Sequence, residues 1–278
     1  MRVIETAAEM REFRRSVTGR TALVATLGGM HAGHEAHLVK AKEIADVTIG
    51  WLFLNPTQFS ASEDLSTYPQ DRKADLAMFE KHGTAAVFAP SVSEVYPPGE
   101  SFRVDPGPIG TVLEGARRPG HFIGVSTVVT KIFALIRPDI AMFGEKDAQQ
   151  LRIIEKMNKE LGFGIEIVRI PTVREPDGLA LSSRNRYLSA DQRAAAPVLY
   201  RALCAGRELW TQGERDADAI KTCVENVLRS EPGVEPDYVS IADSCTLAEF
   251  RGVVTGEALL SLAARVGSTH LIDNLVLD

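Results

Sequence analysis

Short apolar runs alternate along the first part of the chain with segments whose apolar residues recur every three or four positions. The apolar runs predict buried strands at 21–26, 47–55, 85–90, 139–144 and 164–171. The periodic segments predict helices at 34–45, 71–83, 124–136 and 147–162. Strands that alternate with helices need crossover connections, so this pattern predicts a parallel sheet in an α/β domain.

The pattern changes after the turn-rich segment PTVREPDG at 171–178. Two helical patterns and three short strand patterns follow, at 189–212, 215–230, 236–242, 257–265 and 270–277. We therefore predict two domains: a nucleotide-sized α/β domain over residues 1–171 and a smaller α+β domain over residues 172–278.

Composition adds limits on function. The chain has 278 residues, of which 45% are hydrophobic and 24% charged, which is typical of a soluble globular protein. Its net charge is −6, which argues against general nucleic-acid binding because that needs a basic surface. No uninterrupted apolar stretch is long enough for a membrane span, so none is expected. The three cysteines, Cys204, Cys223 and Cys245, form no CxxC pair, which favours a reducing, cytoplasmic setting over a disulfide framework.

The segment TLGGMHAGH at 26–34 lies between the first predicted strand of the sheet and its helix. Gly28 and Gly29 permit a tight turn, and the start of the helix suits a phosphate. His31 and His34 lie three residues apart, so their rings can share one face of the first turn and bind phosphate or donate a proton to a leaving pyrophosphate. A pair of structural histidines is the alternative. A zinc site is less favoured, because no further cysteine or HExxH ligands accompany the pair.

Polar residues also lie at the ends of two other predicted strands. FLNPTQF at 53–59 carries Asn55 and Gln58, whose amides suit the hydroxyl and carboxylate groups of a small substrate; an ordinary Asn-Pro turn is the alternative. FGEKDAQQL at 143–151 carries Lys146, a positive charge suited to phosphate, and Asp147, suited to capping a helix or to Mg²⁺. The alternative there is a charged helix start with a solvated face.

Two loops complete the set. LEGARRPGHFIGV at 113–125 is equally consistent with a flap, an anion contact and a surface loop. DGLALSSRNRYLS at 177–189 offers Ser182, Ser183 and Arg184, a combination suited to clamping phosphate, with a polar loop as the alternative. In an open parallel sheet, ligands bind beyond the carboxyl ends of the strands. These motifs would thus bring positive and neutral hydrogen-bond donors, and almost no nucleophile, to one crevice. Such a set suits ATP-dependent adenylation, in which positioning and charge stabilisation carry the chemistry.

These motifs, with EDLSTYPQD, APSVSEVYP, RPDIAMFGEKDAQQL and HLID, follow one another over nearly the whole chain and resemble the pantothenate synthetase (pantoate–β-alanine ligase) family. That family belongs to the nucleotidylyltransferase superfamily with the HxGH motif. The resemblance implies a Rossmann-like N-terminal domain that binds ATP and pantoate, and a C-terminal α+β lid domain. It also implies a cytoplasmic homodimer that joins (R)-pantoate to β-alanine through a pantoyl adenylate, using ATP and Mg²⁺ and releasing pyrophosphate and AMP.

The resemblance also assigns roles to residues. It makes His34 the proton donor, with His31 and Lys146 as further catalytic residues, and it gives Gln58, Gln150 and Asn55 to the substrates. Val173 would contact the adenine through its backbone, and Mg²⁺ would be held mainly through the ATP phosphates rather than by metal ligands of the protein. The implied ATP site comprises Leu27, Gly28, Gly29, Met30, His31, Ala32, Gly33, His34, Gly144, Glu145, Lys146, Asp147, Val173, Leu181, Ser182, Ser183 and Arg184.

The chain departs from the family's usual sequence at several positions. Ala25 and Leu27 stand where proline and methionine are usual, His37 where leucine is common, and Thr57 where methionine or leucine is usual. These changes bear on substrate affinity and rate more than on the type of reaction. Two other functions compete: a transferase that makes a dinucleotide, and a nucleotide-binding protein without catalysis. ATP consumption with pantoate, measured with and without β-alanine, separates the three.

Overall fold

The computed structural model describes residues 1–61 and 63–278. The chain forms two compact units: unit 1 comprises Met1–Glu145 and Gln150–Pro171, and unit 2 comprises Lys146–Gln149 and Thr172–Asp278. The short segment Lys146–Gln149 thus belongs with unit 2, although the chain on both sides of it belongs to unit 1.

Unit 1 is built on a parallel sheet with the strand order β1-β4-β3-β2-β5-β6. The strands are β1 (Arg2–Ile4), β2 (Thr21–Thr26), β3 (Val47–Leu52), β4 (Ala86–Phe88), β5 (Ile140–Gly144) and β6 (Glu166–Ile170). β2 is central: Ala22 lies opposite Thr48 of β3 on one side and Ile140 of β5 on the other. Because the strands are parallel, the carboxyl ends of β2, β3 and β5 lie at one edge of the sheet. The order of the strands reverses between β2 and β5, and sheets of this kind bind ligands at that point of the edge.

Helices connect these strands and cover the sheet. They are α1 (Ala7–Ser16), α2 (Ala32–Ile44), α3 (Arg72–Lys81), α4 (Val92–Val95), α5 (Glu114–Arg117), α6 (His121–Ile136) and α7 (Ala148–Glu160), with the 3₁₀ turns η1 (Pro56–Gln58), η2 (Gly107–Gly110) and η3 (Glu145–Asp147). Leu38 of α2 and Phe79 of α3 are buried in one core cluster with Val24 of β2. Right-handed crossovers require that α1, α6 and α7 cover the opposite face, and α1 packs on α6 there.

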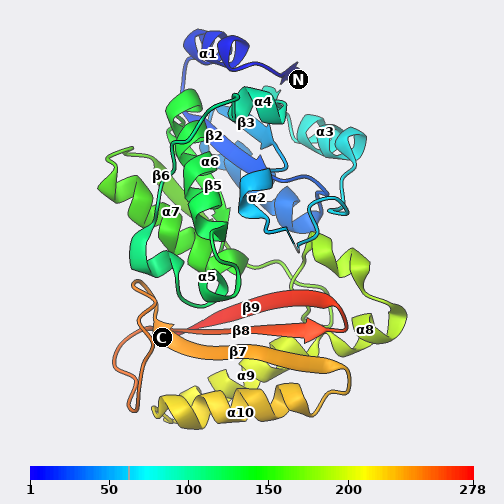
Figure 1. The fold of residues 1–278 in the computed structure, drawn as a ribbon, viewed down its shortest axis with the longest axis vertical. Coiled ribbons are helices and arrows are strands. Elements are labelled where there is room, and N and C mark those ends of the chain that lie inside the picture. The colour runs from blue at the N-terminus through cyan, green and yellow to red at the C-terminus, as the bar shows by residue number, and fades with distance from the viewer. Residues whose placement is uncertain (62) are drawn as a thin grey trace. The chain divides into compact units, whose positions relative to one another are not determined.

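Unit 2 contains an antiparallel sheet of β7 (Val234–Asp243), β8 (Ala258–Val266) and β9 (Thr269–Leu277) in that order. Its other elements are η4 (Ser183–Tyr187), α8 (Ala190–Ala195), α9 (Val198–Thr211) and α10 (Ala217–Arg229). α9 and α10 pack on each other and cover one face of this sheet (Figure 1). Leu203, Ile220 and Leu260 are fully buried between the helices and the strands, so this unit has its own hydrophobic core.

The fold class predicted from the sequence is confirmed: a parallel α/β sheet is followed by a smaller α+β unit. Several elements differ from the prediction: the helices α1, α4 and α5 were not predicted, and two further differences concern β1 and the helix over 189–212. β1 was not predicted, because a strand of three residues forms only by pairing with β4, far along the chain. The helix predicted over 189–212 is two helices that part at Pro197, which has no N–H to continue a helical ladder. Among the residues that the structure describes, no helix is long and apolar enough to cross a membrane.

Candidate active site

The loop between β2 and α2 depends on its two glycines. Gly28 has φ 104° and Gly29 has φ 64°, in the left-handed region that favours glycine. A Cβ atom at Gly29 would lie 2.4 Å from the carbonyl oxygen of Pro69. Both the backbone conformation and the close approach of the 69–75 segment therefore exclude larger residues from this loop.

A buried carboxylate anchors the same loop from α3. Asp75 is 2% exposed, and its two oxygens accept hydrogen bonds from the backbone N–H groups of Gly29 (3.0 Å) and Met30 (2.7 Å). Sequence analysis missed this residue. Its position one helical turn before Phe79, the other buried residue of α3, is the feature that could have revealed an acid on the buried face. Asp75 thus fixes the backbone that leads into the first histidine.

The two histidines cap α2. His31 is the N-cap, and its Nδ1 accepts a hydrogen bond from Gly33 N–H at 3.1 Å, while His34 Nδ1 accepts from His31 N–H at 3.3 Å. The ring centroids are 4.3 Å apart. A backbone N–H can only donate, so each Nδ1 is unprotonated and each neutral ring carries its proton on Nε2. Both imidazoles can therefore act as hydrogen-bond donors through Nε2.

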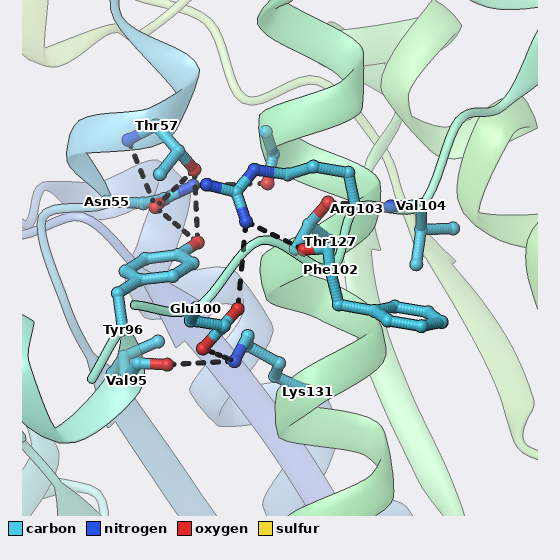
Figure 2. Close-up of polar contacts among 11 residues, drawn as sticks. Asn55, Thr57, Val95, Tyr96, Glu100, Phe102, Arg103, Val104, Thr127 and Lys131 are labelled. Atoms are coloured by element: carbon cyan, nitrogen blue, oxygen red, sulfur yellow. Dashed lines mark hydrogen bonds and ion pairs between the residues drawn. The ribbon is translucent and has the colours of Figure 1, made fainter. Parts of the chain in front are cut away.

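Beyond β3, the turn η1 holds Asn55 and Gln58, which are 1% and 8% exposed. Asn55 Oδ1 accepts from Thr57 N–H at 3.3 Å, and Asn55 Nδ2 donates to Gln58 Oε1 at 3.0 Å. Figure 2 shows this amide among the polar contacts that surround it. The Gln58 side chain is therefore oriented by its neighbour.

The loop RRPGHF supports the backbone of Gln58. The carbonyl oxygen of Gln58 accepts from His121 Nδ1 at 2.8 Å and from Arg118 at 3.4 Å. Arg118 also forms an ion pair with Glu63. Burial raises the pKa of Glu63, but the N–H of Ser60 and the charge of Arg118 outweigh it and hold that pKa below its usual value. The sequence left the role of this loop open, and the structure makes it a support for Gln58.

The third strand end carries the FGEKDAQQL motif. Gly144 ends β5, and a Cβ atom there would lie 3.4 Å from His37 Nε2, so α2 passes close to this strand end. Glu145 begins η3 and Gln150 is half-buried in α7. The Gly28–His34 loop, Asn55, Gln58 and Gly144 thus follow three adjacent strands of unit 1 at one edge of its sheet.

Lys146 and Asp147 belong to unit 2. Their side chains form an ion pair of 3.3 Å, and the Lys146 carbonyl accepts a hydrogen bond from Asn274 Nδ2 at 2.9 Å. The Lys146 side chain is 21% exposed and that of Asp147 is 47% exposed. Asn274 follows the HLID motif directly, so this motif holds the backbone of the lysine.

The remaining predicted residues lie on paired segments of unit 2. Leu181 N–H donates to the Val173 carbonyl at 2.9 Å, and the Ser182 hydroxyl caps η4 by accepting from Arg184 N–H at 3.2 Å. Ser183 is 5% exposed.

Arg174, next to Val173, makes a bidentate ion pair of 2.6 and 2.9 Å with Asp273, which is 3% exposed. Arg174 and Ala180 pair as an antiparallel bridge, and Asp273 of the HLID motif therefore anchors this paired segment to β9. In the part of the chain that the structure describes, no three His, Cys, Asp or Glu side chains gather in a group that could hold a metal ion.

Comparison with known proteins identifies the family. The family profile described as pantoate-beta-alanine ligase matches residues 2–276. The pantothenate synthetase of Roseiflexus sp. (strain RS-1) is 51% identical over 278 residues, which cover 100% of both chains. The one from Herpetosiphon aurantiacus is 48% identical over 277 residues and is also covered in full.

Solved structures agree with this result. The crystal structure of pantothenate synthetase from Thermus thermophilus has a TM-score of 0.93 and 43% identity, covering 99% of both chains. The pantoate-beta-alanine ligase from Francisella tularensis, crystallised with beta-gamma ATP and beta-alanine, has a TM-score of 0.81 and 29% identity, covering 99% of this chain and 97% of its own. This chain is an enzyme that belongs to the pantoate–β-alanine ligase family.

Proposed function

We propose that this enzyme uses ATP to activate the carboxylate of (R)-pantoate and then joins the acyl group to β-alanine, giving pantothenate, AMP and pyrophosphate. One observation carries the proposal. The capping histidines follow β2, and the oriented Gln58 amide follows β3, which is the neighbouring parallel strand. A site for the phosphates of ATP therefore lies beside a site for a small acid that is rich in oxygen atoms. The Francisella tularensis relative, crystallised with beta-gamma ATP and beta-alanine, supports ATP and β-alanine as two of the three substrates.

In the first step, a carboxylate oxygen of pantoate attacks the α-phosphorus of ATP. The new O–P bond gives pantoyl adenylate, and the bond from the α-phosphorus to the bridging oxygen breaks to release pyrophosphate. Nε2–H groups of His31 and His34 donate hydrogen bonds to phosphate oxygens, and the one on His34 stabilises the negative charge of the departing pyrophosphate. Lys146 balances the negative charge that develops on the phosphates.

In the second step, the amine of β-alanine attacks the acyl carbon of the adenylate. A C–N bond forms, the C–O bond to AMP breaks, and the amine loses a proton. Gln58 and Gln150 contact pantoate and β-alanine in this scheme, and Asn55 completes the subsite by holding Gln58 in place. Domain 1–171 binds ATP and pantoate, and domain 172–278 acts as a lid that excludes water from the reactive adenylate.

ATP contacts come from the residues that the resemblance assigns. The loop from Leu27 to His34 and the Gly144–Asp147 segment approach the phosphates and ribose. Val173 holds the adenine through its backbone, and Leu181–Arg184 binds the phosphates with two hydroxyls and a guanidinium. When bound with ATP, Mg²⁺ would supply further charge neutralisation and would be held mainly through the phosphates. Asp147, whose carboxylate is 47% exposed, is the side chain suited to contact it.

Two further features belong to this proposal. The enzyme acts as a homodimer, as the family resemblance implies. It works in the cytoplasm, which agrees with its free cysteines Cys204, Cys223 and Cys245.

The test is exchange of labelled pyrophosphate into ATP, with Mg²⁺ and pantoate and without β-alanine. Exchange that needs pantoate is expected, because the adenylate forms reversibly before the amine enters. Addition of β-alanine then yields pantothenate and AMP in equal amounts. Exchange without pantoate would favour a nucleotidyltransferase, and ATP binding without exchange would favour a nucleotide-binding protein that lacks the first step.

A further inference from the structure

The orientation of the Asn55 amide follows from the chemistry of its neighbours. Oδ1 lies 3.3 Å from Thr57 N–H, which can only donate, and Nδ2 lies 3.3 Å from the Gly124 carbonyl, which can only accept. Exchange of the oxygen and nitrogen would place donor against donor and acceptor against acceptor. Asn55 therefore faces Gln58 with its NH₂ group, and Gln58 must turn its Oε1 toward Asn55.

That contact sets how Gln58 presents its amide to a ligand. Its Oε1 accepts from Asn55 Nδ2 at 3.0 Å, so the NH₂ group is the part of the amide that is turned away from Asn55. An NH₂ group only donates. Gln58 therefore selects acceptor oxygens, such as those of a carboxylate or a hydroxyl group, as long as Asn55 keeps its orientation.

Two hydroxyl groups hold Asn55 in that orientation (Figure 2). Thr57 Oγ1 donates to Asn55 Oδ1 at 2.9 Å, and Tyr96 O–H donates to the same oxygen at 2.8 Å. The two hydroxyls are also 3.0 Å from each other. Both bonds are shorter than the 3.3 Å bond from Thr57 N–H, so the hydroxyls supply the tighter contacts to Oδ1.

Tyr96 is itself held firmly. Lys131 of α6 lies 5.2 Å above its ring and donates to the neighbouring Val95 carbonyl at 2.9 Å. Lys131 also pairs with Glu100 at 2.6 Å. Burial raises the pKa of the Tyr96 hydroxyl, so that group keeps its proton and remains able to donate at neutral pH.

We propose that the hydroxyls of Thr57 and Tyr96 are positioning groups that lock the Asn55 amide and thereby hold the NH₂ group of Gln58 toward the substrate acid. This inference rests on the proposed function, since it takes pantoate to be the ligand of Gln58. Neither residue touches the substrate; both act through Asn55.

The test compares Thr57→Val, which removes the hydroxyl at nearly constant volume, with Thr57→Ser, which keeps it, and with Tyr96→Phe. Steady-state pyrophosphate exchange gives the KM for pantoate, the KM for ATP and the maximal rate. Thr57→Val and Tyr96→Phe are each expected to raise the pantoate KM by roughly 3- to 10-fold, the effect of one hydrogen bond. The KM for ATP stays within about 2-fold, and Thr57→Ser recovers most of the loss.

A double-mutant cycle separates positioning from general structure. If Thr57 acts through Gln58, Thr57→Val adds nothing to the pantoate KM in a Gln58→Ala background. Thr130→Val is the matched control, because it removes a hydroxyl of unit 1 that bonds Met157 Sδ at 3.2 Å, away from Asn55. It should leave the pantoate KM unchanged. Melting temperatures of all variants show whether a loss reflects folding.

The outcomes distinguish the two proposals. Wild-type enzyme without pantoate-dependent exchange overturns the proposed function, and this inference with it. Wild-type exchange together with an unchanged pantoate KM in Thr57→Val and Tyr96→Phe overturns the inference alone. So does an equal loss from Thr57→Val with and without Gln58, or a rise in both KM values that follows the melting temperature.

Discussion

Replacing Asp75 by asparagine should release the loop that leads into the histidine pair. The two carboxylate oxygens accept from Gly29 N–H and Met30 N–H at 3.0 and 2.7 Å. Asparagine keeps one acceptor oxygen, and its NH₂ group then faces the other backbone N–H, donor against donor. The site is too well buried for water to repair this mismatch, since Asp75 is only 2% exposed.

The size of the effect follows from this geometry. A hydrogen bond to a charged group contributes about 1.5–3 kcal/mol, and a buried N–H without a partner costs about 1–3 kcal/mol. These terms overlap, so we expect Asp75→Asn to lower the free energy of unfolding of unit 1 by about 2–4 kcal/mol. For a unit of this size, that corresponds to a fall in Tm of about 5–15 °C. Because the loop positions His31, kcat/KM for ATP should also fall by about 10-fold or more.

Differential scanning calorimetry and ATP-dependent pyrophosphate exchange measure the two effects. Asp71→Asn is the matched control: it makes the same change on the same helix, and Asp71 caps Ala74 N–H at 3.0 Å from an exposed position. Asparagine caps helices as well as aspartate, so the control should shift Tm by no more than about 2 °C. If Asp75→Asn also stayed within that range and kept the wild-type KM for ATP, the carboxylate would not be what holds the loop.

Three further predictions address other parts of the chain. Lys146→Ala should lower pantoate-dependent pyrophosphate exchange by about 10² or more while Tm is maintained, and wild-type exchange would contradict the phosphate role. Gly124→Ala places a Cβ atom 2.2 Å from the Thr57 carbonyl oxygen, so it should lower Tm and raise the pantoate KM; unchanged values of both would show that η1 can move away freely. The N–H and hydroxyl of Thr21 hold the pKa of Asp139 below its usual 3.8, so the stability they provide is present above that pH and is lost as the pH falls through the lowered pKa. In a thermal-unfolding series from neutral pH into acid, Asp139→Asn should therefore be less stable than the wild type at neutral pH and lose less Tm in acid, and an equal acid loss would contradict the assignment.

The sequence predicted the strands whose burial shows as apolar runs. The expected strand over 139–144 appears as β5 (Ile140–Gly144), and the one over 21–26 as β2 with the same bounds. β1 could not be predicted in this way, because only Ile4 of its three residues is buried and its pairing partner β4 lies far along the chain. A pattern within a window records burial, whereas a short edge strand depends on a distant partner.

The candidate site divides in the same manner. His31, Asn55 and Gln58 could be found because each follows a predicted strand in a polar motif, and parallel strands bring their carboxyl ends to one edge. Asp75 and Tyr96 could not be found in this way, because they reach the loops from other segments of the chain. Their roles depend on the atoms that they contact: the N–H groups of Gly29 and Met30 for Asp75, and Asn55 Oδ1 for Tyr96. That information comes from three-dimensional pairing, which the spacing of residues does not contain.

In the contacts that support the proposed site, hydrogen-bond acceptors of the protein are bonded to donors of the protein. This pairing explains how a protein with a net negative charge can offer a site for anions. With a net charge of −6, the chain has no general excess of positive charge to attract phosphates. In unit 1, however, the acceptor atoms are turned inward: the Asp75 carboxylate, Asn55 Oδ1, Gln58 Oε1 and the Nδ1 atoms of both histidines all accept from the protein itself.

The groups that the proposed site offers to a ligand are donors, namely the Nε2–H groups of the imidazoles and the Gln58 NH₂ group. Such a site attracts carboxylate and phosphate oxygens through fixed dipoles, which need no reorganisation when charge moves during the reaction. A substitution that lets an acceptor turn outward, as Thr57→Val is designed to permit for Gln58 Oε1, should therefore weaken the binding of the substrate acid without any change in the charge of the surface.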